Sequence, residues 1–102
     1  MEKRKCVKTD TITVNMLIHA LRDVFREEKE QGLSTKDTGD LILRLAAHQE
    51  KKIYLTDAEC RKSIQALNKL RDAYIQEGRY TDCIDNRLIR ILKARYRIYR
   101  GD

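Results

Sequence analysis

The sequence predicts a mainly α fold: a small domain of four helices with an αα-hairpin at its C-terminus, and a short N-terminal strand as an open alternative. Apolar residues recur at spacings of three and four in four segments, which is the helical period. The chain holds four glycines and no proline, as suits helices joined by short turns. A length of 102 residues is that of one domain. We therefore expect a basic segment over residues 1–14 and a single helical domain over residues 15–102.

The first two helices are predicted in the first half of the chain. The first covers residues 15–30, where Leu17, Leu21 and Val24 form one apolar stripe, and Gly32 follows where a helix end is expected. The second is predicted to start among the capping residues 34–40 and to reach about residue 51.

The third helix has the clearest start signal in the chain. Thr56 and Glu59 form a capping box, in which the threonine oxygen accepts the N–H of the third helical residue and the glutamate accepts the N–H of the cap residue. Apolar residues then recur at helical spacing as far as Tyr74, and Gly78 predicts the end of the helix. We expect Leu67, in the middle of this stripe, to share one core with Leu88 of the next helix.

The fourth helix is predicted to begin near Thr81 and Asp82 and to extend to Arg100. At about 100° per residue, an apolar half that contains Leu88 lies opposite a basic half. Arg95 falls inside the apolar half, where its stem could cover the core or its guanidinium could pair with an acid. The basic half comprises Arg87, Arg90, Lys93, Arg97 and Arg100.

Residues 11–14 favour a strand, because all four are β-branched and polar and apolar side chains alternate there. This segment, the basic tail before it, the turn at residues 32–34 and the Leu-Ile pair at 41–42 resemble a ribbon–helix–helix DNA-binding domain. The chain departs from that family in lacking its Pro-Glu helix opening and in an insertion at residues 36–40. The resemblance implies a dimer whose paired strands enter the major groove. It would place three residues at base edges: Thr11, Thr13 and Asn15.

The charge is concentrated at the two ends of the chain. The formal net charge is +6, and residues 86–100 contain six cations and no acid. The N-terminal stretch is also basic, while the middle of the chain is close to neutral. Basic ends on a neutral body indicate an anionic partner. The residues predicted to bind it are Arg87, Arg90, Lys93, Arg97, Arg100, Lys3, Arg4 and Lys5.

The predicted function is that of a small nucleic-acid-binding regulatory or accessory protein, without catalytic activity. A positive stripe on one helix can follow phosphates, and Tyr80, Tyr96 and Tyr99 lie near enough in sequence to stack on bases. The alternative is a protein–protein adaptor or inhibitor whose arginine-rich helix grips an acidic surface of a larger complex. A homodimer is compatible with either function, and DNA and RNA are both open.

Signals for catalysis, metals or cofactors are weak, so we expect none of the three. His19 and Asp23 could pair on one helix face, but no nucleophile motif stands nearby. The three cysteines form no metal-ligand spacing. The His19–Asp23 pair and Cys83, at a helix start, keep a thiol- or histidine-dependent enzyme as a further alternative. No apolar run reaches roughly 18 residues and no secretory signal is recognisable, so we expect a cytoplasmic location and no membrane contact.

Overall fold

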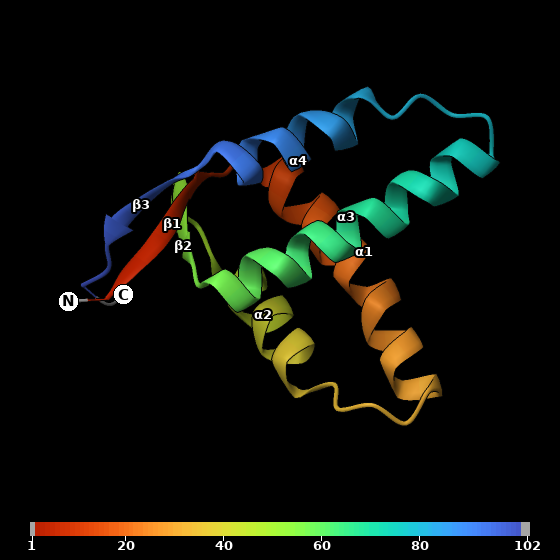
Figure 1. Cartoon of the computed structure of the whole chain (residues 1–102), viewed down its shortest axis with the longest axis horizontal. Helices are drawn as coiled ribbons and strands as arrows, with labels where there is room; N and C mark the ends of the chain where they lie inside the picture. Colours follow the sequence, from red (N-terminus) through yellow and green to blue (C-terminus); the bar gives the residue numbers. More distant parts are fainter. Residues whose placement is uncertain (1, 101–102) are drawn as a thin grey trace.

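The fold is α+β. Within residues 2–100, which the computed structural model describes, four helices are joined to a three-stranded antiparallel sheet (Figure 1). The sheet lies at one end of the molecule, and the helices extend away from it. The elements in chain order are β1 (Lys3–Lys8), α1 (Thr11–Glu30), α2 (Lys36–Ala47), β2 (Lys52–Leu55), α3 (Asp57–Gln76), α4 (Asp82–Lys93) and β3 (Arg95–Ile98).

The predicted fold class, a mainly α four-helix domain ending in an αα-hairpin, is therefore wrong. All four helices are present, but the chain continues past α4 into β3, which pairs with β1. The strands are hard to recognise in the sequence because they have only four to six residues and are rich in lysine and arginine. Lysine is depleted in strands, so propensity alone gives little indication of a sheet here.

The sheet has one buried face and one open face. β1 is the central strand, and Cys6 lies opposite Tyr54 of β2 and Arg95 of β3. Side chains alternate between the two faces of a strand, and Val7, Ile53 and Leu55 are buried on the inner face. Contacts from α3 and α4 cover that face. The alternate residues of the three strands therefore point to the open side.

The core lies where the helices meet each other and the inner face of the sheet. α1 packs on both α2 and α3, and α3 packs on α4. Leu67 is fully buried and Leu88 is 9% exposed, and both belong to one core cluster, so their predicted shared core is confirmed. No helix within residues 2–100 combines the length and apolar character needed to cross a membrane.

α1 begins at Thr11, so residues 11–14, for which the sequence left strand and helix open, are helical and the strand alternative is wrong. The Asp10 carboxylate caps the helix by accepting the Thr13 N–H at 2.7 Å, and this bond lowers the pKa of Asp10. A side-chain cap satisfies an amide that the helix itself leaves unpaired, which favours a helix despite the β-branched residues. Thr13 is buried. The segment therefore offers neither the strand nor the exposed Thr13 that the ribbon–helix–helix resemblance implies.

The predicted capping box and glycine helix ends are confirmed. Thr56 Oγ1 accepts the Glu59 N–H at 3.1 Å, and the Glu59 carboxylate accepts the Thr56 N–H at 2.9 Å. Gly32 and Gly78 have φ angles of 72° and 71°, the left-handed region that ends a helix most easily with glycine. These local signals set the ends of α1 and α3.

α4 ends at Lys93 and not at Arg100, so the predicted long C-terminal helix is wrong. After Lys93, cationic and apolar residues alternate with a period of two, which is the strand period. Arg95 is thus exposed on β3 and does not lie among the apolar residues of a helix. Arg97 and Arg100 also leave the helix face on which they were predicted.

Candidate functional site

The open face of the sheet is strongly basic. Strand alternation places residues from both ends of the chain on it, because the N-terminal strand β1 pairs with both β2 and the C-terminal strand β3. Four of its cations, two lysines and two arginines, are exposed. We define the basic sheet face as Arg4, Cys6, Lys8, Lys52, Tyr54, Arg95 and Arg97.

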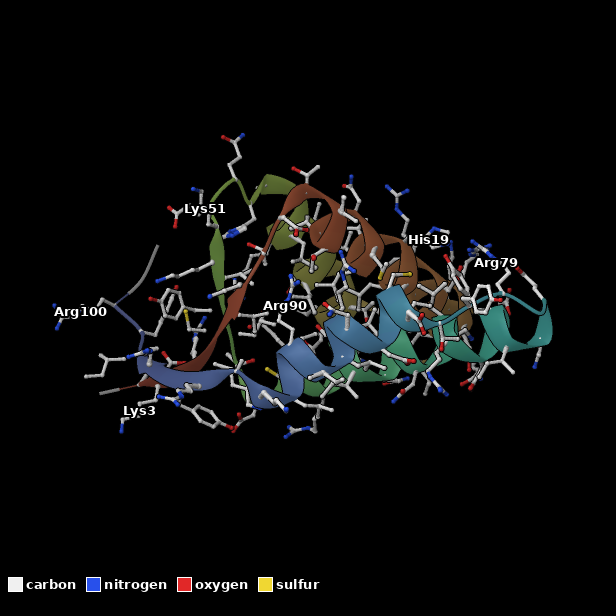
Figure 2. The ribbon with its side chains drawn as sticks, turned by 90° about the horizontal axis from the view of Figure 1, so that it is seen from above. Lys3, His19, Lys51, Arg79, Arg90 and Arg100 are labelled. Carbon is white, nitrogen blue, oxygen red and sulfur yellow. The ribbon has the colours of Figure 1, made fainter. Side chains whose placement is uncertain are left out.

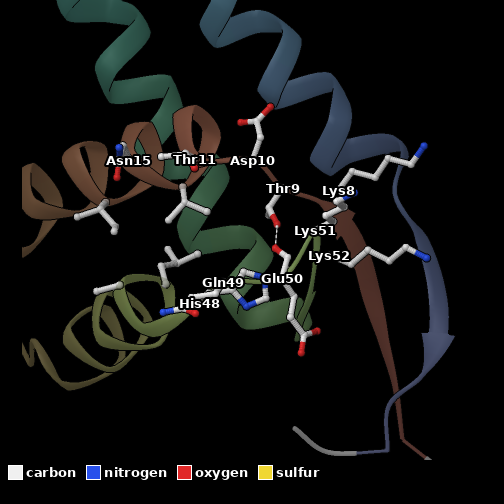
Figure 3. Close-up of a pocket in the computed structure, with 14 residues that line it drawn as sticks. Lys8, Thr9, Asp10, Thr11, Asn15, His48, Gln49, Glu50, Lys51 and Lys52 are labelled. Atoms are coloured by element: carbon white, nitrogen blue, oxygen red, sulfur yellow. Dashed lines mark hydrogen bonds between the residues drawn. The ribbon is translucent and has the colours of Figure 1, made fainter.

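Cations lie directly opposite one another on this face. Arg4 is in register with Arg97, and Lys8 is in register with Lys52. Figure 3 shows the side chains of Lys8 and Lys52 extending in the same direction. Like charges directly opposite each other on two strands destabilise a sheet. An anion bound across these pairs would relieve the repulsion.

Few acids neutralise the basic sheet face. Arg4 donates to the Glu2 carboxylate at 2.9 Å, and this bond raises the pKa of the guanidinium. Arg4 is the one member of the face that has an ion pair within residues 2–100. The other cations of the face are therefore available to an external anion.

The last turn of α4 extends the basic surface beyond the sheet. Arg90 and Lys93 stand beside β1 and β3 and form one wall of a shallow hollow of about 670 Å³. Six of the nine residues around this hollow are cations, and none is an acid. Its lining is Cys6, Lys8, Lys52, Tyr54, Arg90, Lys93, Ala94, Arg95 and Arg97.

Aromatic rings accompany the cations. The Arg4 guanidinium lies 3.7 Å from the centre of the Tyr99 ring, which is a cation–π contact. The rings of Tyr99 and Tyr54 are 5.9 Å apart and tilted by 55°. Tyr54 therefore packs against the Tyr99 ring and also lines the basic hollow.

Four of the eight residues predicted to bind an anion come together at this site. Arg4 and Arg97 belong to the basic sheet face, and Arg90 and Lys93 border it. Arg90 also donates to Thr13 Oγ1 at 3.1 Å and lies 4.0 Å from the Asp10 carboxylate. Arg90 therefore has a structural role besides any role in binding.

The other four predicted residues lie elsewhere. Arg87 donates to Thr13 Oγ1 and to the Cys83 carbonyl, at 3.2 and 3.1 Å. Lys5 and Lys3 belong to the alternate set of β1 positions, which points to the inner side of the sheet. Figure 2 shows Lys3 and Arg100 projecting from the end of the sheet, whereas Arg90 lies at its junction with α4.

Three cations of the site were absent from the predicted set: Lys8, Lys52 and Arg95. The signal that identifies Arg95 is the two-residue alternation of Arg95 to Ile98, which a helical wheel hides. Lys52 and Tyr54 alternate in the same way with the buried Ile53 and Leu55. No local feature of the sequence indicates that residues 52–55 and residues 95–98 belong to the same sheet.

A second hollow, of about 710 Å³, lies beside the start of α1 and the end of α2 (Figure 3). Its walls mix signs, because Asp10 and Glu50 stand among its lysines. Thr9 Oγ1 donates to the Glu50 carbonyl at 3.0 Å, and this bond joins two of the residues that line the hollow. This mixed lining suits an anion less well than the hollow at the basic sheet face.

The basic sheet face presents groups that can bind an anion. Guanidinium and ammonium groups donate charge-assisted hydrogen bonds to phosphate or carboxylate oxygens. Cys6 is the one thiol around the basic hollow, and neither a histidine nor a carboxylate lines that hollow to act as its general base. No protein-family model matches the chain, and neither the curated proteins nor the solved structures include a significant match to it.

Proposed function

We propose that this protein is a small nucleic-acid-binding regulatory or accessory protein that holds phosphates on its basic sheet face. The observation that supports this most strongly is the pairing of cations across strands, Arg4 with Arg97 and Lys8 with Lys52, of which only Arg4 has an acidic partner, Glu2, within residues 2–100. A charged surface whose only role is solubility normally carries both basic and acidic side chains. A row of phosphates supplies the missing negative charge, and release of its condensed counterions favours binding.

The test is the paired substitution Arg95→Gln and Arg97→Gln. Both side chains are exposed on β3, so the fold should tolerate the change. Loss of two exposed ion pairs, each of about 0.2–1 kcal/mol, should weaken binding to mixed-sequence DNA or RNA roughly two- to thirtyfold. Fluorescence anisotropy with labelled oligonucleotides at about 50 mM salt, where electrostatic binding is strong, measures the effect.

The matched control is Arg22→Gln with Lys29→Gln. It removes the same net charge from exposed positions on α1, which runs away from the sheet (Figure 1). Affinity should change little, because charges more than a Debye length away are largely screened. Equal losses in the two double variants would show that net charge matters and the basic sheet face does not.

An adaptor that binds an acidic protein surface is the second candidate. It is favoured by the side chains of Ile89 and Leu92, which are 51% and 57% exposed on α4 next to Lys93. Protein interfaces bury apolar side chains at their centre, whereas phosphate contacts do not need them. Leu92→Ser should therefore weaken binding to a protein partner and leave oligonucleotide affinity unchanged.

A further inference from the structure

We propose that the nucleic acid on the basic sheet face is single-stranded, with its phosphates along Lys8, Lys52, Arg95 and Arg97 and one base stacked on Tyr54. This inference rests on the proposed function. By standard strand spacings, the face is about 10 Å wide and about 20 Å long along β1. A single strand can lie along such a strip with phosphates and bases both within reach.

The face is poorly shaped to read a duplex. Base edges in B-DNA are reached through a major groove about 12 Å wide, which admits a helix or a two-stranded ribbon. The basic sheet face has three strands and is backed by α3 and α4, so it cannot enter that groove. Contact with a duplex would be confined to phosphates on its outer surface.

The neighbouring helix α4 is also unsuited to a groove. Helix–turn–helix proteins contact bases with the N-terminal residues of their recognition helix, but the first turn of α4 carries Asp82 and Asp85. Hydrogen bonds from Thr81 and Arg71 lower the pKa of Asp85, which keeps it ionised. α4 meets the sheet with its C-terminus, where the helix dipole disfavours phosphate.

Tyr54 gives the site a surface for a base. Proteins that bind single strands combine a basic groove with aromatic rings, and each stacked base contributes about 5- to 150-fold in affinity. Tyr54 lines the hollow that contains the cations, and its ring packs beside the Arg4–Tyr99 stack. The phosphate contacts and the stacking surface thus belong to one continuous site.

Apart from its arginines and lysines, which can contact guanine, the face has little that distinguishes one base from another. Asparagine, glutamine and acidic side chains, which read adenine and cytosine edges, are missing from the seven residues of the basic sheet face. Stacking accepts every base because each has a π-face. The site should therefore bind single strands of mixed sequence with similar affinity.

The experiment compares single-stranded DNA, single-stranded RNA and duplex DNA of one sequence, each of about 12 nucleotides per strand, within the range of known site sizes. Anisotropy is measured for the wild type, Tyr54→Leu and Tyr54→Phe. Tyr80→Leu is the control, because Tyr80 is 90% exposed between α3 and α4, away from the sheet. Circular dichroism monitors the fold of each variant.

We expect a single strand to bind at least about tenfold more tightly than the duplex. Tyr54→Leu should weaken single-strand binding by about 5- to 150-fold, whereas Tyr54→Phe and Tyr80→Leu should leave it nearly unchanged. Duplex binding as tight as single-strand binding, or a folded Tyr54→Leu protein with wild-type affinity, would overturn the inference and leave the proposed function standing. Failure of all three probes to bind would overturn the proposed function as well.

Discussion

Glu28 is a buried charge whose partners keep it ionised. It is 9% exposed; its carboxylate accepts Thr38 Oγ1–H at 2.6 Å and Lys62 Nζ–H at 2.8 Å. Burial alone raises the pKa of this carboxyl, but the bonds from Lys62 and Thr38 outweigh burial, so the net pKa lies below the ordinary value of 4.5. One carboxylate thus links α1 to α2 and α3.

Replacing Glu28 with Gln should destabilise the protein by about 1–3 kcal/mol at pH 7. The variant leaves the Lys62 ammonium, which is 24% exposed, without its anionic partner. Urea unfolding measures the change. Glu30→Gln is the control, because Glu30 is exposed on the same helix. Equal, small effects of the two substitutions would show that the buried contacts of Glu28 contribute no more than a surface charge.

The contribution of Glu28 should also depend on pH. Its pKa is lower in the folded state than in the unfolded state, so the unfolded chain takes up the proton first as the pH falls. The stabilisation is complete above the ordinary pKa of 4.5 and is lost as the pH falls through the folded-state pKa. The difference between wild type and Glu28→Gln should therefore shrink below pH 4.5, and a constant difference would contradict this assignment.

Lys5 shows that a residue in a basic stretch need not bind a partner. Its ammonium group donates to the carbonyls of Ile91 and Leu92, at 3.3 and 3.2 Å, in the last turn of α4. A cation there interacts favourably with the helix dipole. The sequence places Lys5 beside Arg4 and cannot reveal that these two side chains point to opposite faces of a sheet.

Among the secondary-structure elements, α3 has a start that the sequence specifies locally. Thr56→Ala removes the side-chain acceptor of its capping box and should cost about 1 kcal/mol. Thr35→Ala is a matched control, because Thr35 precedes α2 without a side-chain capping bond. Thermal or urea unfolding should show a loss for the first variant and a clearly smaller one for the second. Equal losses would show that the hydroxyl of Thr56 does not act through the cap.

Helices could be predicted here because their signals are local. Caps and glycines lie within a few residues of the turns they determine, as at Thr56 and Gly78. The strands could not be predicted because each depends on a distant partner: Lys5 lies between Leu55 and Tyr96. The β-branched residues 11–14 mislead for a different reason: the adjacent Asp10 cap and the burial of Thr13, and not their strand propensity, determine their structure.

At the scale of the whole molecule, the antiparallel sheet concentrates the charge at one end. β1 brings the basic N-terminal residues beside the basic β3, while the helices carry mixed charges away from them. The prediction of an anionic partner follows from the distribution of charge along the sequence. The face that would bind it depends on the register between β1 and its two neighbours, which that distribution does not contain.

The central claim, that the basic sheet face binds nucleic-acid phosphates, is tested most directly by the salt dependence of binding. Each phosphate contact on a single strand contributes a log–log slope of about −0.7, so Lys8, Lys52, Arg95 and Arg97 together should give about −3. Arg95→Gln with Arg97→Gln should make the slope shallower by roughly one to two units. Identical slopes for the wild type and this double variant, or no binding at about 50 mM salt, would contradict the claim.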